Sequence, residues 1–77
     1  MRKTIATIPK NSMDEVRVSL SEFKGHTYVD VRVYTEFEGD SEKRPTKKGI
    51  TVRPDLLPEL RQALEQAEAE ARAAGLL

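Results

Sequence analysis

The stretch from Val16 to Tyr34, VRVSLSEFKGHTYVDVRVY, decides the fold. Apolar residues occupy every second position on both sides of its centre, at Val16, Val18, Leu20, Val29, Val31 and Val33. A period of two is typical of β-strands, because successive side chains point to opposite faces of a sheet. The segment Phe23-Lys24-Gly25-His26 between the two runs predicts a tight hairpin, since Gly25 tolerates the backbone angles that such turns require.

Two weaker runs extend this hairpin into a sheet. Thr4 to Ile8 predicts a short first strand that ends at Pro9, and Ile50 to Val52 predicts a short last strand. The stretch from Glu38 to Lys48 is polar, rich in charge and contains Gly39 and Pro45, so we expect a long loop there.

From Pro54 the apolar period becomes that of a helix. Apolar residues recur every three or four positions, at Leu57, Leu60, Leu64, Ala67 and Ala71. Pro54 suits the first helical position and Gly75 a stop, so we expect a helix of about 17–20 residues. The pattern predicts a single α+β domain over residues 1–77, with a four-stranded antiparallel meander followed by one C-terminal helix.

The size of the chain favours a homodimer. A chain of 77 residues buries too little surface to be very stable alone, and small domains usually gain disulfides, a metal or a partner subunit. There is no Cys and His26 is the single His, which excludes disulfides and clusters of thiolate or imidazole metal ligands. Oligomerisation remains, and we expect Leu57, Leu60 and Leu64 to serve as core and dimer contacts of the helix.

The net charge is zero, but the charges are unevenly distributed. Residues 1–54 carry 11 Lys and Arg against eight Asp and Glu, whereas residues 55–77 carry two against five. The predicted sheet is therefore basic and the predicted helix acidic, which leaves a nucleic-acid partner possible for the sheet.

One helix covers only one side of a sheet, and we expect the helix to lie over the valines and leucines. The opposite side would then carry rings and cations, namely Arg17, Tyr28, Arg32 and Tyr34 beside Ser19 and Asp30. Such a surface suits single-stranded nucleic acid, because rings stack on unpaired bases and cations meet phosphates. The alternative is that cross-strand pairs of Tyr and Arg only stabilise the sheet.

With these residues assembled, the chain resembles the positive cofactor four family of transcriptional coactivators, in particular its single-stranded-DNA-binding domain and short bacterial relatives. The resemblance covers about Val16 to Leu64 and rests on three motifs in order: the Phe23-Lys24-Gly25 turn, the Asp30-x-Arg32-x-Tyr34 strand and the segment Lys47-Lys48-Gly49-Ile50-Thr51. It implies a homodimer that binds single-stranded or melted DNA with little sequence preference and acts as a coactivator or regulator of transcription.

Residue roles carried over from the family give a set of candidate contacts. Phe23 would stack on a base, Lys24 and Arg32 would contact phosphates, and His26 stands where the family often has a Lys. The sequence departs from the family at two positions. Thr35 replaces a Trp that would stack on a base, and Tyr34 or Phe37 would compensate for its loss. Ser21 replaces a residue that is often basic in the family. With the basic loop and the sheet residues, the candidate nucleic-acid-binding set is Arg17, Phe23, Lys24, His26, Arg32, Tyr34, Lys43, Arg44, Lys47 and Lys48.

The sequence offers no catalytic set. Ser21, His26 and Asp30 can be written as a triad, but they fall on one hairpin and a domain this small hardly encloses a pocket. We therefore predict a protein that is not an enzyme and needs no cofactor.

Two other functions remain open. The first is a protein-interaction module that docks the transcription machinery through its sheet or through an acidic helix face bearing Glu65, Glu68 and Glu70, and the second is RNA binding. No apolar run is long enough to span a membrane or form a signal peptide. We expect a cytoplasmic, nucleoid-associated protein in a bacterium, or a nuclear one in a eukaryote.

Overall fold

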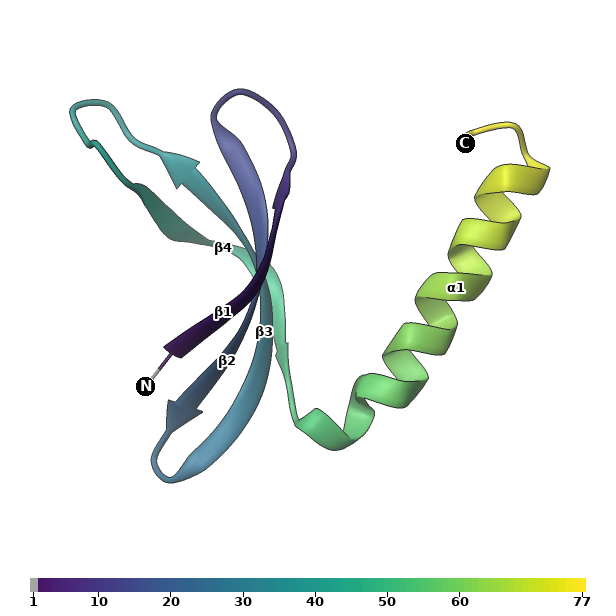
Figure 1. The fold of residues 1–77 in the computed structure, drawn as a ribbon, viewed down its shortest axis with the longest axis horizontal. Helices are drawn as coiled ribbons and strands as arrows, with labels where there is room; N and C mark the ends of the chain where they lie inside the picture. Colours follow the sequence, from purple (N-terminus) through teal and green to yellow (C-terminus); the bar gives the residue numbers. More distant parts are fainter. Residues whose placement is uncertain (1) are drawn as a thin grey trace.

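The structure is a computed structural model that describes residues 2–77, which form one sheet and one long helix (Figure 1). The elements in chain order are β1 (Arg2–Pro9), β2 (Asp14–Phe23), β3 (His26–Glu36), β4 (Lys43–Val52), the short 3₁₀ helix η1 (Pro54–Leu56) and α1 (Leu57–Ala73). The strands lie in the order β1-β2-β3-β4 and all neighbours are antiparallel. The predicted α+β meander with a C-terminal helix is confirmed.

The hairpin of β2 and β3 is the regular centre of the sheet. Its pairing runs without a shift from Asp14 opposite Thr35 to Phe23 opposite His26. The two-residue turn has positive φ angles, 51° at Lys24 and 80° at Gly25. Positive φ at both positions is the turn geometry whose twist matches that of the flanking strands. The predicted hairpin is confirmed, and Lys24 lies at its tip.

Strand β4 begins earlier than the sequence predicts. Lys43, Arg44 and Pro45 pair with β3, opposite Glu36, Thr35 and Tyr34 respectively. The expectation of a loop over residues 38–48 is therefore wrong, and β3 and β4 are joined by residues 37–42. Pro45 is tolerated because β4 is an edge strand, which has one side free of ladder hydrogen bonds.

Gly49 allows β4 to approach β3 closely beside an irregularity in their pairing. A Cβ added at Gly49 would lie 2.5 Å from the carbonyl oxygen of Val31 and 2.8 Å from the Cα of Arg32. Both atoms belong to the backbone of the central strand, so they cannot move without displacing the sheet. The position therefore requires glycine.

The two sides of the sheet differ in chemistry. The side that we call the apolar face carries Val16, Val18, Leu20, Val29, Val31, Val33, Ile50 and Val52. The side that we call the polar face carries Glu15, Arg17, Ser19, Ser21, Phe23, His26, Tyr28, Asp30, Arg32 and Tyr34. This division follows from the unbroken register of β2 and β3, because side chains alternate along each strand.

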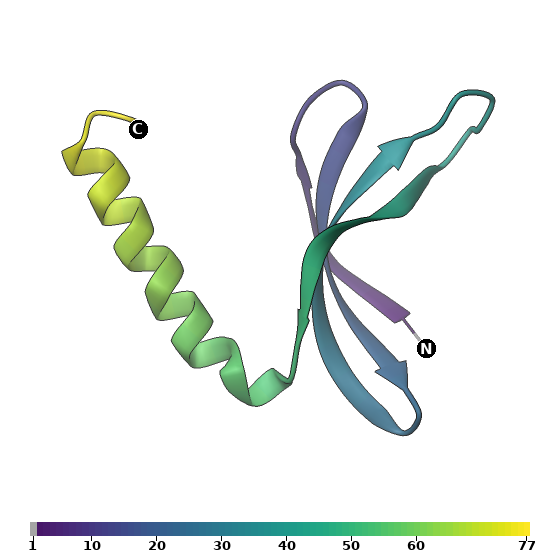
Figure 2. The ribbon, with the colours of Figure 1, turned by 180° about the vertical axis from the view of Figure 1, so that it is seen from behind.

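Helix α1 does not cover the apolar face of its own chain. It extends away from the sheet (Figures 1 and 2), and none of its residues is buried. Leu57 and Leu64 are 39% and 62% exposed and Leu60 is partly buried, so the prediction that these leucines pack into the core of the chain is wrong. The reason is the connection, since η1 follows β4 after one residue and leads the chain away from the sheet.

The end of α1 agrees with its predicted stop. Gly75 has a φ of 75°. The amide of Leu76 donates to the carbonyl oxygen of Ala71 at 2.8 Å, and the amide of Gly75 donates to the carbonyl oxygen of Arg72 at 3.1 Å. These two bonds form the Schellman motif that closes many helices. Among residues 2–77 no helix combines the length and the apolar character that crossing a membrane requires.

Little of the described part of the chain, residues 2–77, is buried, and most of its buried residues lie on the polar face. The buried residues are Val29, Tyr34, Ser19 and Asp30, of which only Val29 lies on the apolar face. Ile8 and Ile50 are 55% and 48% exposed. The polar face therefore has a packed centre within one chain, whereas the apolar face does not.

We expect Gly49→Ala to destabilise the protein by about 1–3 kcal/mol, because the added methyl group overlaps backbone atoms of β3. Urea unfolding monitored by circular dichroism measures this change in the free energy of unfolding. Lys48→Ala is the matched control on the same strand, and it should stay within about 0.5 kcal/mol of the wild type. Equal stability of the two variants would refute the close approach at Gly49.

Candidate nucleic-acid interface

The carboxylate of Asp30 organises the centre of the polar face. Asp30 is 2% exposed, and its oxygens accept hydrogen bonds from Arg2 of β1 at 3.2 Å, Arg32 of β3 at 2.9 Å and Thr51 of β4 at 2.8 Å. A buried charge is tolerated only when it is paired and hydrogen-bonded. One carboxylate thus connects the two edge strands of the sheet to its centre.

The charge of Asp30 is stabilised by these partners. Burial by itself raises the pKa of Asp30, but the hydrogen bonds from Arg32, Thr51 and Arg2 outweigh it and bring the pKa below its ordinary value of 3.8. Asp30 therefore stays ionised at neutral pH, and its ion pairs persist there.

A second carboxylate, Glu15, holds two further cations. Arg17 and Lys43 both donate to its side chain, and the Lys43 bond measures 3.1 Å. The bond from Arg17 is the main reason why the pKa of Glu15 lies below its ordinary value, and the bond from Lys43 adds to it. Together the two carboxylates hold four cations, so this part of the polar face keeps a surplus of positive charge.

Tyr34 lies between the two clusters. It is 5% exposed, its hydroxyl accepts a hydrogen bond from Arg2 at 3.2 Å, and the guanidinium of Arg17 lies 4.1 Å from the centre of its ring. Since Arg17 already covers the ring, Tyr34 acts here as a support for cations rather than as a free stacking surface.

Arg32 is largely occupied by the protein itself. Its Nε and Nη2 donate to Asp30, its Nη1 donates to the carbonyl oxygen of Thr46 at 2.9 Å, and Nη2 also reaches Thr51 at 3.3 Å. A guanidinium has five N–H donors, so at most one of those of Arg32 is left for a ligand.

The hairpin end of the polar face is open. Phe23 is 63% exposed although it is a large apolar residue, and the Nζ of Lys24 lies 5.4 Å from the centre of its ring. His26 pairs directly with Phe23 across the strands and is also exposed. The structure therefore brings together a free ring, a cation and an imidazole at one tip of the sheet.

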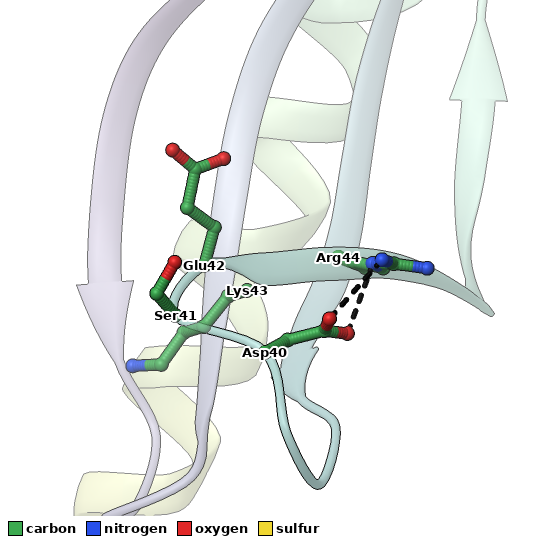
Figure 3. Close-up of a pocket in the computed structure, with 5 residues that line it drawn as sticks. All are labelled: Asp40, Ser41, Glu42, Lys43 and Arg44. Carbon is green, nitrogen blue, oxygen red and sulfur yellow. Dashed lines mark hydrogen bonds and ion pairs between the residues drawn. The ribbon is translucent and has the colours of Figure 1, made fainter.

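The predicted basic loop is divided between the two sides of the sheet. Figure 3 shows Lys43 and Arg44 pointing in opposite directions around a polar hollow of about 190 Å³. Lys43 joins Glu15 on the polar face, whereas Arg44 pairs with Asp40 at 3.1 Å. Lys47 is exposed near the irregular part of β4, and Lys48 lines a hollow of about 380 Å³ on the apolar face with Lys10, Val16, Val31, Arg32, Val33, Gly49 and Ile50.

Several residues of this face were not in the candidate set. Arg2 and Thr51 contact Asp30 from strands distant in sequence, and no local pattern reveals such pairing. Tyr28 lies on the polar face next to His26, and its alternation with the valines was the available signal. Thr35, at the position where the resemblance implies a Trp, donates a hydrogen bond to Asp14.

Comparison with known proteins identifies close structural relatives. The profile of the family described as Transcriptional Coactivator p15 (PC4) matches residues 10–63. The crystal structure of a PC4 homologue from Burkholderia pseudomallei has a TM-score of 0.82 and 37% sequence identity, over 88% of this chain and 98% of that one. A second crystal form of it has a TM-score of 0.79 and 38% identity, over 86% and 88% of the two chains.

A phage protein has the same fold. It is a bacteriophage T5 homologue of the eukaryotic transcription coactivator PC4, implicated in recombination-dependent DNA replication. Its TM-score is 0.72 at 28% identity, over 97% of this chain and 94% of that one. A search of individually curated proteins gives no significant match.

We expect Asp30→Asn to lower the free energy of unfolding at pH 7 by about 1.5–3 kcal/mol, because Arg2 and Arg32 lose their shared counterion. Since the pKa of Asp30 is lowered in the folded state, its contribution is present above about pH 4 and is lost as the pH falls through the folded value. Urea unfolding at several pH values should show a weaker acid dependence in the variant than in the wild type.

Asp55→Asn is the matched control for this substitution. Asp55 pairs with Arg53 at 3.5 Å, but both side chains are about 70% exposed, so its removal should change stability little. If Asp30→Asn were as harmless as Asp55→Asn, the polar face would not depend on its buried carboxylate.

Proposed function

The chain belongs to the Transcriptional Coactivator p15 (PC4) family, and from this premise we propose that it is a homodimeric protein that binds single-stranded or melted DNA with low sequence specificity. The observation that carries the proposal is the 63% exposed ring of Phe23 beside Lys24, at the open end of a polar face with surplus positive charge. Rings that stack on bases, next to cations that meet phosphates, are the usual means of binding unpaired strands.

The ion pairs of the polar face support this function. They hold Arg17, Arg32 and Lys43 in fixed places, so these cations lose little conformational freedom when a phosphate approaches. Contacts to phosphates do not depend on the base, and stacking tolerates every base. Low sequence specificity follows from both.

The exposed apolar surfaces support a dimer. Ile50 and Leu64 are 48% and 62% exposed, and the apolar face and the leucine stripe of α1 are left without a partner in one chain. In a dimer, the leucine stripe of each copy would pack on the apolar face of the other copy. The charges agree, because Lys10 and Lys48 line the hollow on the apolar face and α1 carries the exposed carboxylates Glu65, Glu68 and Glu70.

The alternative functions differ in a measurable way. A module that docks the transcription machinery through the glutamates of α1 would not bind an oligonucleotide, and an RNA-binding protein would prefer RNA over DNA of the same sequence. Titrating labelled single-stranded DNA, RNA and duplex DNA at two salt concentrations therefore separates the three.

We expect Lys24→Glu to weaken binding to an oligothymidylate of about 20 bases by about tenfold or more, and to reduce the salt slope by about one. The reason is the loss of a phosphate contact at the hairpin tip. Fluorescence anisotropy of the labelled strand measures both quantities. Arg72→Glu makes the same charge change at the far end of α1, and binding to that variant should match the wild type.

Comparing the two variants with the wild type also separates a wrong site from a wrong function. Loss of binding in Arg72→Glu together with normal binding in Lys24→Glu would move the interface from the hairpin to the helix. A wild-type protein without affinity for the oligonucleotide would contradict the proposed function itself.

We expect Leu64→Glu to shift the protein from dimer to monomer, because a charge would replace a leucine buried between the two copies. Light scattering over a range of protein concentrations measures the mass. Gln62→Glu introduces the same residue on the opposite side of α1 and should remain dimeric. A dimeric Leu64→Glu variant would show that the leucine stripe is not part of the interface.

A further inference from the structure

We propose that Tyr28 is a second base-stacking residue and forms, with Phe23 and His26, an aromatic platform at the hairpin end of the polar face. The platform would take two neighbouring unpaired bases of a single strand. This inference rests on the proposed function and adds a residue to its site.

The register places the three rings on one surface. Phe23 is opposite His26, and Tyr28 is opposite Ser21, two positions further along the same strands. Residues two apart on a strand share a face, so all three project on the side that also carries Arg17 and Arg32. The platform is thus continuous with the cations that would hold the phosphates.

Within the part of the chain that the structure describes, neither a ring nor a cation is stacked on the face of Tyr28. The centre of the Tyr28 ring lies 6.5 Å from that of His26, and the two ring planes are tilted by 59°. The two rings are therefore tilted against each other and are not stacked face to face. The cross-strand neighbour, Ser21, is too small to cover the ring, and Tyr28 remains partly exposed.

Tyr34 provides the contrast within the same strand. It is 5% exposed and has the guanidinium of Arg17 over its ring. Of the two tyrosines, therefore, only Tyr28 can receive a base.

The separation of the rings favours unpaired bases over a duplex. Diagonal neighbours across two antiparallel strands, such as Phe23 and Tyr28, lie about 7–8 Å apart. This is about twice the 3.4 Å rise of stacked bases in B-form DNA. Two rings at this spacing suit bases that have been pulled apart, and bases inside a duplex are not accessible to them.

Tyrosine fluorescence tests the contact directly. The chain has no Trp and only two Tyr, so Tyr34→Phe leaves Tyr28 as its single tyrosine. We expect oligothymidylate to quench the emission of this variant, and an abasic strand of the same length, which has phosphates but no bases, to leave it nearly unchanged. Strong quenching by the abasic strand, or none by oligothymidylate that is bound, would overturn the inference.

Affinity measurements add an independent readout. Tyr28→Leu should bind oligothymidylate about tenfold more weakly than the wild type, because one stacked base is lost, whereas Tyr28→Phe keeps the ring and should bind nearly normally. Both variants should bind the abasic strand like the wild type. Circular dichroism establishes that each variant is folded, and if Tyr28→Leu is not, the fluorescence of Tyr34→Phe decides.

The outcomes separate the inference from the function on which it rests. Normal binding of oligothymidylate by Tyr28→Leu overturns the role of Tyr28 but leaves the proposed function intact. Absence of binding in the wild type overturns both. Weaker binding of both strands by Tyr28→Leu would mean a structural role for the ring and would also overturn the inference.

Discussion

The buried carboxylate of Asp30 is the interaction on which the rest of the structure depends. It accepts hydrogen bonds from β1, β3 and β4, so a charge that water cannot reach is satisfied only when all these strands are in place. Arg2 and Arg32 are fixed by it, and Arg2 in turn bonds the hydroxyl of Tyr34. The centre of the polar face is therefore built as an ionic network, and this decides which groups remain free for a ligand.

The network divides the polar face into two regions. At the centre, the cations are paired and the ring of Tyr34 is covered, so this region offers ordered positive charge. At the hairpin end, Phe23 and Lys24 are exposed and Tyr28 is partly exposed, so this region offers rings and a cation to a ligand. The apolar face is largely uncovered within one chain, because Val29 is the one buried residue among those of this face. In our account a second copy covers that face, and the polar faces of both copies stay open to the strand.

Alternation of side chains was enough to predict the hairpin, the meander and the division into two faces, because strand register follows directly from it. The start of β4 was missed because Lys43 to Lys48 has the charges and the proline of a loop. The burial of Tyr34 was missed because a period of two places it on the polar face but does not show that Arg2 and Arg17 fold over it. The packing of α1 was predicted wrongly because an amphipathic stripe indicates that a helix has a face to bury, but not in which chain its partner lies.

The central claim is that the two faces have separate partners, a second copy of the chain on one and an unpaired strand on the other. Heteronuclear NMR of the protein, labelled on valine methyl groups and aromatic rings, tests this in a single titration with oligothymidylate. We expect the NMR signals of the Phe23 and Tyr28 rings to shift strongly, while the methyl signals of Val16, Val31 and Val33 keep their chemical shifts. Large shifts of these valines with unchanged aromatic signals would show that the strand binds the apolar face, and would contradict the account.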